Sequence, residues 1–426
     1  MKKLLALLVT VALAITCCFS LVGCGETEYA GIKKVNSVSD IQIGFICLHD
    51  DSSTYDKNFI DAIYKAAADA GIPKDNVHLK TGIPESSDCY DAAVELVEKS
   101  NCNIVFADSF GHEAYMLQAA QKYPDVQFCH ATGTKAHTEV RGNYHNAFAS
   151  IYEGRYLAGY AAGLKLNTMK DKAVNKNFKV GYIGAYTYAE VVSGYTSWFL
   201  GVQAALDEGY TATMDVQFTG SWYDYTAEYN AALALINNYN CVLISQHADS
   251  LGAPTACAEK GVPNVSYNVD TTKMSDKSQI ADTYVTSSRI NWEPYFLYTF
   301  DCLLSGTEIA LDWTGDLSTG SVEIISVGAA AAAGTQEAIN MIKLELISGA
   351  RRVFDVSKFT VGEKTLTNYR ADVDDMGDFV GETEVIYADS QIPGATVYFH
   401  ESGKAMRSAP YFDLQIDGIN LVNTVF

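Results

Sequence analysis

The chain has 426 residues, and its 51 Asp and Glu residues outnumber its 30 Lys and Arg residues, which gives a formal net charge of −21 at pH 7. This acidic balance argues against nucleic acid or an anionic bilayer surface as a partner. With 48% apolar residues, the chain can build a large core, and its length predicts two domains at about 100–200 residues each.

The N-terminus has the pattern of a secretory signal. Lys2 and Lys3 precede an apolar run over 4–15, and a small-residue segment then ends at Cys24. The apolar run is shorter than the roughly 20 residues that a membrane-spanning helix needs. The last four residues, Leu-Val-Gly-Cys, resemble a bacterial lipobox. We therefore predict a lipoprotein signal peptide over 1–23 and lipidation of Cys24. The alternatives are an ordinary cleaved signal and a retained membrane anchor.

Residues 24–39 are small, polar and unpatterned, and we predict a flexible tether there. No second long apolar run follows, so we expect a soluble body. Seven cysteines follow Cys24, an odd number with no C-x-x-C pair, and four of them stand in apolar segments. Because such cysteines behave as small hydrophobes, we predict no disulfide framework.

Strand-like and helix-like segments then alternate along the chain. Short β-rich apolar runs fall at 41–47, 77–80, 103–107 and 126–129, and helical spacing falls at 58–70, 90–99 and 113–122. The pattern restarts further on, where 178–184 echoes 41–46 and 241–250 echoes 104–109. Alternation of this kind predicts parallel sheets with right-handed crossovers. We predict an α/β fold of two doubly wound parallel-sheet lobes; the alternative is one large doubly wound sheet.

The two lobes share the chain between them. We assign 41–147 with about 289–325 to the N-terminal lobe, and 148–288 with about 326–354 to the C-terminal lobe. Between the halves, 153–163 is rich in glycine and alanine, which predicts a helix suited to close packing. Residues 355–426 are acidic and Gly-rich with short β-like runs, and we expect a β-rich extension that packs on the body.

The motifs of common enzymes are missing from the sequence. It has no G-x-G-x-x-G, P-loop or G-x-S-x-G segment, and His112–Glu113 lacks the second His of a zinc protease. We therefore expect no enzymatic activity, no cofactor and no metal site. The loops after the strands are instead rich in aromatic, amide and carboxylate side chains, notably 109–110, 218–224, 246–250, 267–270 and 289–293. Such loops favour a planar, nitrogen-rich ligand that stacks on aromatic rings.

Several segments together resemble the basic membrane protein family of solute-binding lipoproteins, also called the purine nucleoside receptor family. The resemblance covers about 41–354, and its carriers are Ser109-Phe-Gly, Tyr123-Pro-Asp-Val-Gln-Phe, Glu153-Gly-Arg-Tyr-Leu-Ala-Gly, Lys179-Val-Gly-Tyr-Ile, Ser221-Trp, Gln246-His-Ala-Asp-Ser and Tyr267-Asn. It implies the type I periplasmic-binding fold, with a hinge between the lobes. It also implies a lipid-anchored subunit of an ABC uptake transporter on the extracytoplasmic face of the cell membrane, with permease and ATPase subunits as partners.

The resemblance and the loop chemistry together give the candidate ligand-binding residues, which are Tyr55, Ser109, Phe110, Trp222, His247, Asp249, Asn268, Asp270 and Trp292. We expect Trp222 to stack on a purine and Asp249 to accept hydrogen bonds from its N–H groups. The family's nucleoside-binding branch resembles this chain less well, because Asn268 stands where an Asp contacts ribose and Ile290 lies near the place of a Lys. A free base such as adenine or hypoxanthine is therefore the predicted ligand.

Other functions stay open on the sequence alone. Another small ligand, such as a sugar or an autoinducer, would also stack on Trp. A surface nucleoside hydrolase would need an acid–base pair, and we interpret the adjacent carboxylates Asp50 and Asp51 as a solvated loop. A surface lipoprotein that senses a ligand without transporting it is a further alternative.

Overall fold

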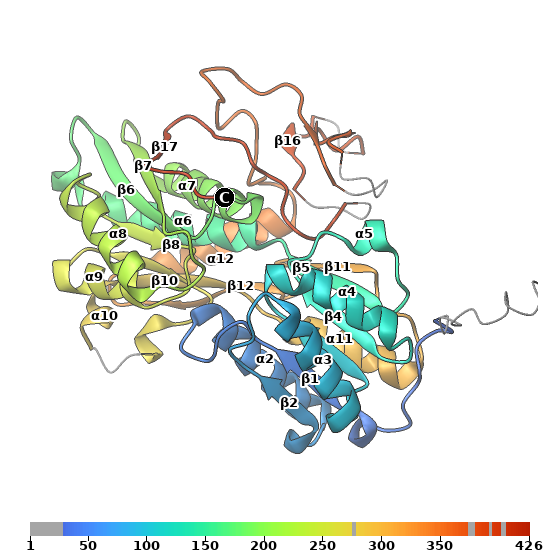
Figure 1. The fold of residues 1–426 in the computed structure, drawn as a ribbon. Helices are drawn as coiled ribbons and strands as arrows, with labels where there is room; N and C mark the ends of the chain where they lie inside the picture. The colour runs from blue at the N-terminus through green and yellow to red at the C-terminus, as the bar shows by residue number, and fades with distance from the viewer. Residues whose placement is uncertain (1–28, 275–277, 374–379, 392–393, 402–405) are drawn as a thin grey trace, which may run out of the picture.

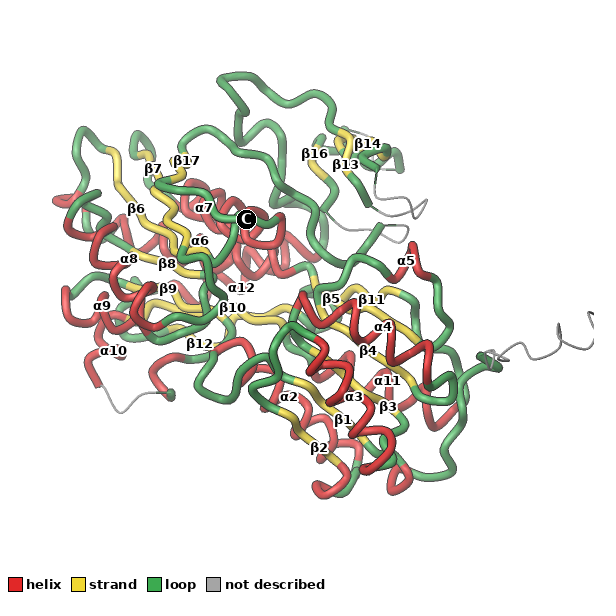
Figure 2. The backbone as a smooth tube through the Cα atoms, viewed as in Figure 1, coloured by secondary structure: helices red, strands yellow, loops and turns green. Residues whose placement is uncertain are grey.

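The computed structural model describes residues 29–426 except 275–277, 374–379, 392–393 and 402–405 (Figure 1). The predicted signal peptide and Cys24 lie outside the described residues. Two α/β lobes carry most of the chain, each built on its own sheet (Figure 2). The predicted two-lobed α/β fold is therefore confirmed. Within the described residues, no helix is long and apolar enough to cross a membrane.

The sheet of the N-terminal lobe has the strand order β11-β5-β4-β3-β1-β2, and every neighbouring pair is parallel. Its strands are β1 (Ile43–Ile46), β2 (Val77–Lys80), β3 (Ile104–Ala107), β4 (Gln127–Ala131), β5 (Tyr144–Ala149) and β11 (Asp312–Gly315). Its helices are α2 (Thr54–Ala70), α3 (Ser87–Ser100), α4 (Glu113–Lys122), α5 (Ala136–Glu139) and α11 (Glu293–Ser305). The central strands β1 and β3 are buried throughout, which explains their unbroken apolar sequences.

The sheet of the C-terminal lobe has the order β12-β10-β9-β8-β6-β7-β17. Its strands are β6 (Asn177–Gly184), β7 (Thr211–Phe218), β8 (Ile244–Gln246), β9 (Asn264–Tyr267), β10 (Tyr284–Ile290), β12 (Val322–Val327) and β17 (Ile419–Leu421). Its helices are α6 (Ile151–Asn167), α7 (Ala189–Ala205), α8 (Tyr225–Asn237), α9 (Gly252–Lys260), α10 (Ser278–Thr283) and α12 (Thr335–Ile347). Only β12 among these strands runs antiparallel to its neighbour, β10.

Two boundaries differ from the sequence prediction. Helix α2 begins at Thr54 rather than at 58, because the Ser53 side chain accepts a hydrogen bond from the Asp56 backbone and caps the helix earlier. Residues 322–325 lie in the C-terminal lobe rather than in the first, because β12 pairs with β10 along its length. The lobes are joined by the segments after β5, after β10 and after β11.

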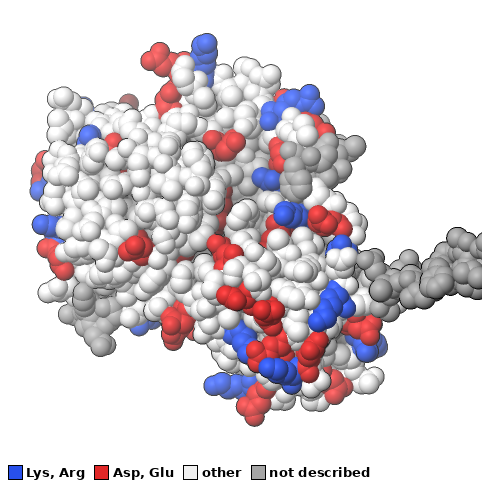
Figure 3. All heavy atoms as spheres, viewed as in Figure 1, with Lys and Arg blue, Asp and Glu red and all other residues white. Residues whose placement is uncertain are grey.

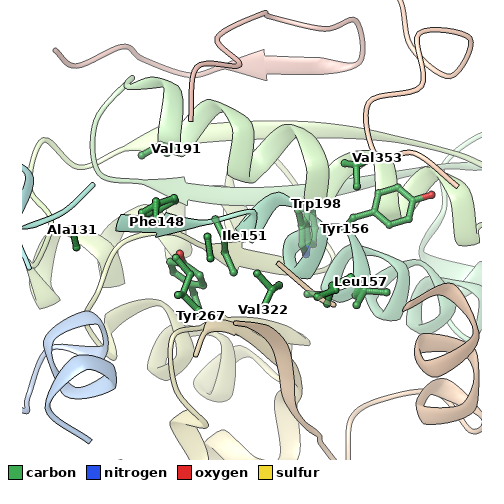
Figure 4. Close-up of a cluster of buried hydrophobic side chains, with 14 of the residues drawn as sticks. Ala131, Phe148, Ile151, Tyr156, Leu157, Val191, Trp198, Tyr267, Val322 and Val353 are labelled. Carbon is green, nitrogen blue, oxygen red and sulfur yellow. The ribbon is translucent and has the colours of Figure 1, made fainter. Parts of the chain in front are cut away.

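Helices α6 and α7 pack tightly in the core of the C-terminal lobe. A Cβ atom on Gly159 would collide with the Trp198 backbone carbonyl, and one on Gly201 would collide with that of Tyr156. Trp198 itself is fully buried, and Figure 4 shows it close to α6 residues of this core. The small-residue helix predicted at 153–163 is thus confirmed, with glycine required where the backbones approach.

The extension over 355–426 differs from the expected β-rich segment. In its described part, the strands β13 (Arg370–Ala371), β14 (Thr383–Glu384), β15 (Ile386–Tyr387) and β16 (Tyr398–Phe399) have two residues each, with irregular chain between them. Aromatic packing, rather than a long ladder of strand hydrogen bonds, holds the extension on the body: Phe354 and Phe412 stack with ring centroids 4.3 Å apart. Strand β17 then joins the edge of the C-terminal sheet beside β7.

Charge is unevenly distributed over the face shown in Figure 3, where charged atoms gather on the N-terminal lobe and the C-terminal lobe is mostly uncharged. Several charged side chains of the N-terminal lobe form exposed ion pairs on or between helices, such as Lys65–Asp69 at 2.7 Å and Lys122–Glu98 at 3.3 Å. Pairs of this kind contribute about 0–1 kcal/mol each to stability. The acidic excess therefore bears on solubility more than on the fold.

Candidate ligand-binding site

A cavity lies between the two lobes, where the carboxyl ends of the strands of both sheets face each other. It encloses about 390 Å³ of atom-free space, part of it open to solvent. Its lining residues are Leu48, His49, Tyr55, Asp56, Ser109, Phe110 and Thr132 from the N-terminal lobe, and Glu190, Trp222, His247, Asp249 and Tyr267 from the C-terminal lobe. Open parallel sheets bind ligands at this edge, because the loops that leave the strands converge there.

The structure brings most of the predicted residues to this cavity. Those that line it are Tyr55, Ser109, Phe110, Trp222, His247 and Asp249. Asn268 stands just behind the lining, where its side-chain amide donates to Asp249 Oδ1 at 3.2 Å. The strand-end rule found these positions, since each follows a buried strand or begins the next helix.

Trp292 and Asp270 are corrections to the prediction. Trp292 is 1% exposed and stacks on Phe59 with ring centroids 4.4 Å apart, so its side chain belongs to the apolar core. Asp270 accepts hydrogen bonds from Thr272 and, at 3.1 Å, from Ser326 Oγ. Its carboxylate is engaged in capping a turn and in joining β12 to the loop after β9. Neither residue lines the cavity.

Sequence reasoning missed six lining residues. Leu48 and His49 directly follow β1, Thr132 follows β4 and Tyr267 ends β9, so the strand-end rule could have found them. Asp56 and Glu190 lie in the first turns of α2 and α7; the Ser53 cap marks the start of α2, whereas no side chain caps α7.

Thr132 also has an unusual backbone. Its φ of 68° is a left-handed conformation that β-branched residues rarely adopt. Such strain persists where the surrounding structure requires it and is concentrated at functional sites. The left-handed backbone of Thr132 is therefore a second observation that points to a functional role for this cavity.

Aromatic rings form one rim of the cavity. The indole of Trp222 is half-buried, and it contacts Tyr186 at 5.2 Å and Tyr188 at 6.2 Å between ring centroids. Phe110 of the other lobe lies 5.9 Å from Tyr188 and is 43% exposed. These rings leave aromatic surface uncovered beside the cavity, where a planar ligand can stack.

Carboxylates supply much of the polar lining. Asp56, Glu190 and Asp249 all face the cavity, and no Lys or Arg is found among its described lining residues. Burial raises the pKa of Asp249 well above its usual value, and the charges of Glu228, Asp56 and Glu190 add to this effect. The carboxyl oxygens thus offer hydrogen-bond acceptors to a ligand with N–H or O–H donors, while the raised pKa of Asp249 favours its neutral form, which can also donate.

The lobes touch each other around the cavity. The Thr54 backbone N–H donates to the Asp249 carbonyl at 2.8 Å, and the rings of His49 and Tyr223 lie 5.3 Å apart. Near the crossing strands, the Asn58 amide donates to the Ile290 carbonyl at 2.9 Å. The cavity is therefore largely enclosed, as in the closed form of a two-lobed binding protein.

A group that could hold a metal ion lies beneath the cavity. Cys47, Asp56 and Asp108 are buried, with one donor atom of each within 4.8 Å of the others. Burial is the largest cause that raises the pKa of Asp108 and of the Cys47 thiol well above their usual values. The neutral forms are thus favoured, whereas a metal needs the deprotonated ligands. We assign no metal to this group.

Comparison with known proteins agrees with this geometry. A Haloferax volcanii protein that bears the name of an ABC transporter glucose-binding protein is 27% identical over 296 residues, which are 70% of this chain and 66% of the relative. A purine-binding protein of Brucella abortus is 30% identical over 225 residues, which are 53% of this chain and 58% of the relative. The matches thus span less than two thirds of either relative.

A solved structure shows the same fold. It is an ABC transporter solute-binding protein from Conexibacter woesei, which matches 73% of this chain and 98% of its own with a TM-score of 0.57 at 17% identity. The family model described as "ABC transporter substrate-binding protein PnrA-like" matches residues 30–353, which contain every residue that lines the cavity and both lobes except β17. The chain therefore belongs to the PnrA-like family of ABC transporter substrate-binding proteins.

Proposed function

We propose that the chain captures a purine base in the interlobe cavity and delivers it to the permease and ATPase subunits of an ABC importer. The observation that carries this proposal is the joint placement of Trp222 and Asp249 in one cavity wall. The Asp249 backbone N–H donates to the Trp222 carbonyl at 2.9 Å, so a stacking face and an acceptor are held in a fixed relation. A purine offers both a π-face and N–H donors.

The neighbourhood of Asn268 and Ile290 supports a base rather than a nucleoside. The Asn268 amide is already engaged by Asp249, and Ile290 is 2% exposed. Neither position supplies the charged group that the family's nucleoside-binding branch directs at a sugar. A ribose would therefore find no charged partner at these two places.

Calorimetry on the purified protein tests the proposal. Bound ligand is first removed by unfolding and refolding, and adenine, hypoxanthine, guanine and their nucleosides are then titrated in turn. We expect a free base to bind at least tenfold more tightly than its nucleoside, a difference of about 1.4 kcal/mol. Absence of heat with every purine would contradict the proposal.

A sugar is the second candidate ligand, because one relative bears the name of a glucose-binding protein. Hydroxyl groups would donate to Asp56, Glu190 and Asp249, and a sugar ring can pack on Trp222. Titration with glucose in the same experiment separates the two candidates. Binding of glucose without binding of any purine would favour the sugar.

The proposal also places the protein on the extracytoplasmic face of the cell membrane, held there by a lipid on Cys24. Support comes from the sequence pattern at 21–24 and from membership of a family of transporter subunits. The predicted tether over 24–39 is not free in its described part, because the Ile32 N–H donates to Glu308 Oε1 at 3.1 Å and the Val35 N–H donates to the Leu303 carbonyl at 3.0 Å on the N-terminal lobe.

A further inference from the structure

A buried arginine stands behind the wall of the cavity. Arg155 on α6 is 1% exposed, and one of its terminal nitrogens donates to the Gln246 carbonyl at 3.0 Å. Its guanidinium carbon lies 3.2 Å from the ring centre of Tyr267. Burying a charge is costly, and well-packed apolar residues often serve stability equally well. The cost of burying this charge points to a role for Arg155 beyond packing.

The second contact of Arg155 reaches a cavity residue. Its other terminal nitrogen lies 3.0 Å from His247 Nδ1. A guanidinium only donates hydrogen bonds, so His247 Nδ1 must accept and carry no proton. The proton of the neutral imidazole then stands on Nε2, which lies 3.4 Å from Glu190 Oε1. Nε2–H is thus a donor at the cavity surface.

The alternative states of His247 are disfavoured by its surroundings. Protonation of Nδ1 would set an N–H group against the guanidinium. Burial and the charge of Arg155 lower the pKa of His247, and Glu190 opposes them. The other titratable groups that line the cavity are His49, Tyr55, Asp56, Asp249 and Tyr267, and the ring centre of Tyr182 on β6 lies 5.9 Å from the Arg155 guanidinium carbon.

We infer that Arg155 is a positioning residue that holds His247 as the neutral Nε2–H tautomer, so that the cavity presents one fixed donor beside three carboxylates. The inference rests on the proposed function for the identity of the ligand. It also narrows the ligand class to molecules that set an acceptor atom near their N–H donors. Purine edges have this arrangement, whereas a phosphorylated ligand would face three carboxylates.

Nitrogen NMR of the ligand-free protein tests the tautomer without any ligand. The protein is labelled with ¹⁵N-histidine, and the His247 signals are assigned by their loss in His247→Gln. We expect a protonated Nε2 and an unprotonated Nδ1 from about pH 6 to pH 8. In Arg155→Met the imidazole should titrate at higher pH, because a cation has been removed. A protonated Nδ1 in the unaltered protein, or the same spectrum in Arg155→Met, overturns the inference.

Adenine calorimetry tests the consequence for binding. Arg155→Met should weaken adenine binding by about two- to tenfold, the effect of one hydrogen bond. Arg155→Lys, which keeps a charged donor, should recover part of this loss. In a His247→Phe background, Arg155→Met should have little further effect, because the pair acts as a unit. Equal losses in both backgrounds would assign Arg155 a packing role and overturn the inference.

Arg351, which contacts the same helix α6 from outside it, provides a control. Arg351 donates to the Tyr156 hydroxyl at 3.0 Å and pairs with Glu345, away from the cavity, so Arg351→Met should leave adenine affinity unchanged. If the unaltered protein binds no purine, the proposed function fails while the NMR measurement still decides the role of Arg155. If Arg155→Met does not fold, the tautomer of the unaltered protein and the Arg155→Lys variant decide it.

Discussion

At the residue scale, the cavity combines one stacking surface with several acceptors. Trp222 supplies uncovered aromatic surface, and Asp249 supplies an acceptor whose geometry is set by the Asn268 amide at 3.2 Å. Stacking is tolerant of the ligand, since every base has a π-face, whereas hydrogen bonding to the base edge discriminates between ligands. The two residues should therefore differ in the kind of effect that their substitution has.

Trp222→Ala should weaken binding of all purines alike. Loss of stacking on one base costs about 1–3 kcal/mol, or roughly a fivefold to hundredfold loss of affinity. Calorimetry with adenine, hypoxanthine and guanine measures this effect. An unchanged affinity combined with a sharply lower melting temperature would show that Trp222 serves the core instead. Trp313, a half-buried tryptophan of β11, provides the matched control through Trp313→Ala.

Asp249→Asn should change the preference among purines. Asn keeps an oxygen that can accept from Asn268, but it replaces the other acceptor with a donor. A buried polar group left without its partner costs about 1–3 kcal/mol, so the preferred base should lose roughly fivefold to a hundredfold in affinity. Competition among adenine, hypoxanthine and guanine checks the change of preference. Asp50→Asn, at an exposed turn, is the control; equal loss for every base would contradict the role.

At the scale of elements, the extension depends on aromatic packing and on one buried acid. Glu401 is 3% exposed, and its Oε2 accepts from the Phe412 backbone at 2.8 Å. Burial raises the pKa of Glu401 to about 8. In the unfolded chain the pKa of a Glu is about 4.3, so the folded state retains a proton there at neutral pH.

Glu401 should make the protein less stable as the pH rises. Between about pH 4.3 and pH 8 the folded state binds one more proton than the unfolded state, so stability falls by about 1.4 kcal/mol per pH unit for this group. Above pH 8 this fall ends. Glu401→Gln should remove the contribution, and the difference in unfolding free energy between variant and parent should grow from pH 5 to pH 8. A difference that is independent of pH would contradict the assignment.

At the scale of the whole molecule, the extension joins the two lobes. Ser408 donates through its backbone to Asp312 Oδ2 at 2.8 Å and accepts at its hydroxyl from the Asn146 amide at 3.0 Å, both in the N-terminal lobe. Strand β17, which begins at Ile419, pairs with β7 of the C-terminal lobe. Any motion of the lobes must therefore be accommodated by this short segment.

Asp312→Ala should destabilise the molecule, because the Ser408 N–H loses its partner in a buried place. An unsatisfied buried group costs about 1–3 kcal/mol. Urea unfolding measures the change. Asp61→Ala removes an exposed partner of Lys57 on the same lobe and should cost under about 1 kcal/mol. Equal effects of the two substitutions would show that Ser408 is held by other contacts.

The membrane anchor is a property of the whole mature protein. Cys24→Ala should leave the chain unprocessed or release it from the membrane fraction, because the lipid can no longer be attached. Fractionation followed by mass spectrometry of the N-terminus measures both outcomes. Normal membrane retention with an unmodified N-terminus would reject lipidation of Cys24. Cys47→Ala alters a buried cysteine directly after β1 and serves as the control for membrane retention.

Local sequence patterns are enough to predict most of the helices and strands and the sheet edge at which the site lies. Period and composition predicted β2 and α4 to the residue, because burial on both faces and helical spacing are local patterns. The positions of Trp222, His247 and Asp249 after strands predicted that they lie together, because parallel strands direct their following loops to the same edge of the sheet. The glycine and alanine residues of α6 likewise predicted that this helix packs closely against another.

Which of these side chains face the cavity depends on packing between segments that are distant in the sequence. Trp222 and Trp292 both follow strands, yet the second turns into the core against Phe59, because the neighbouring helix offers it an apolar surface there. The burial of Arg155 and its contact with His247 depend on how α6 packs against β8 and β9. Such contacts join residues that are far apart in the sequence, and no local pattern encodes the direction in which a side chain leaves a loop.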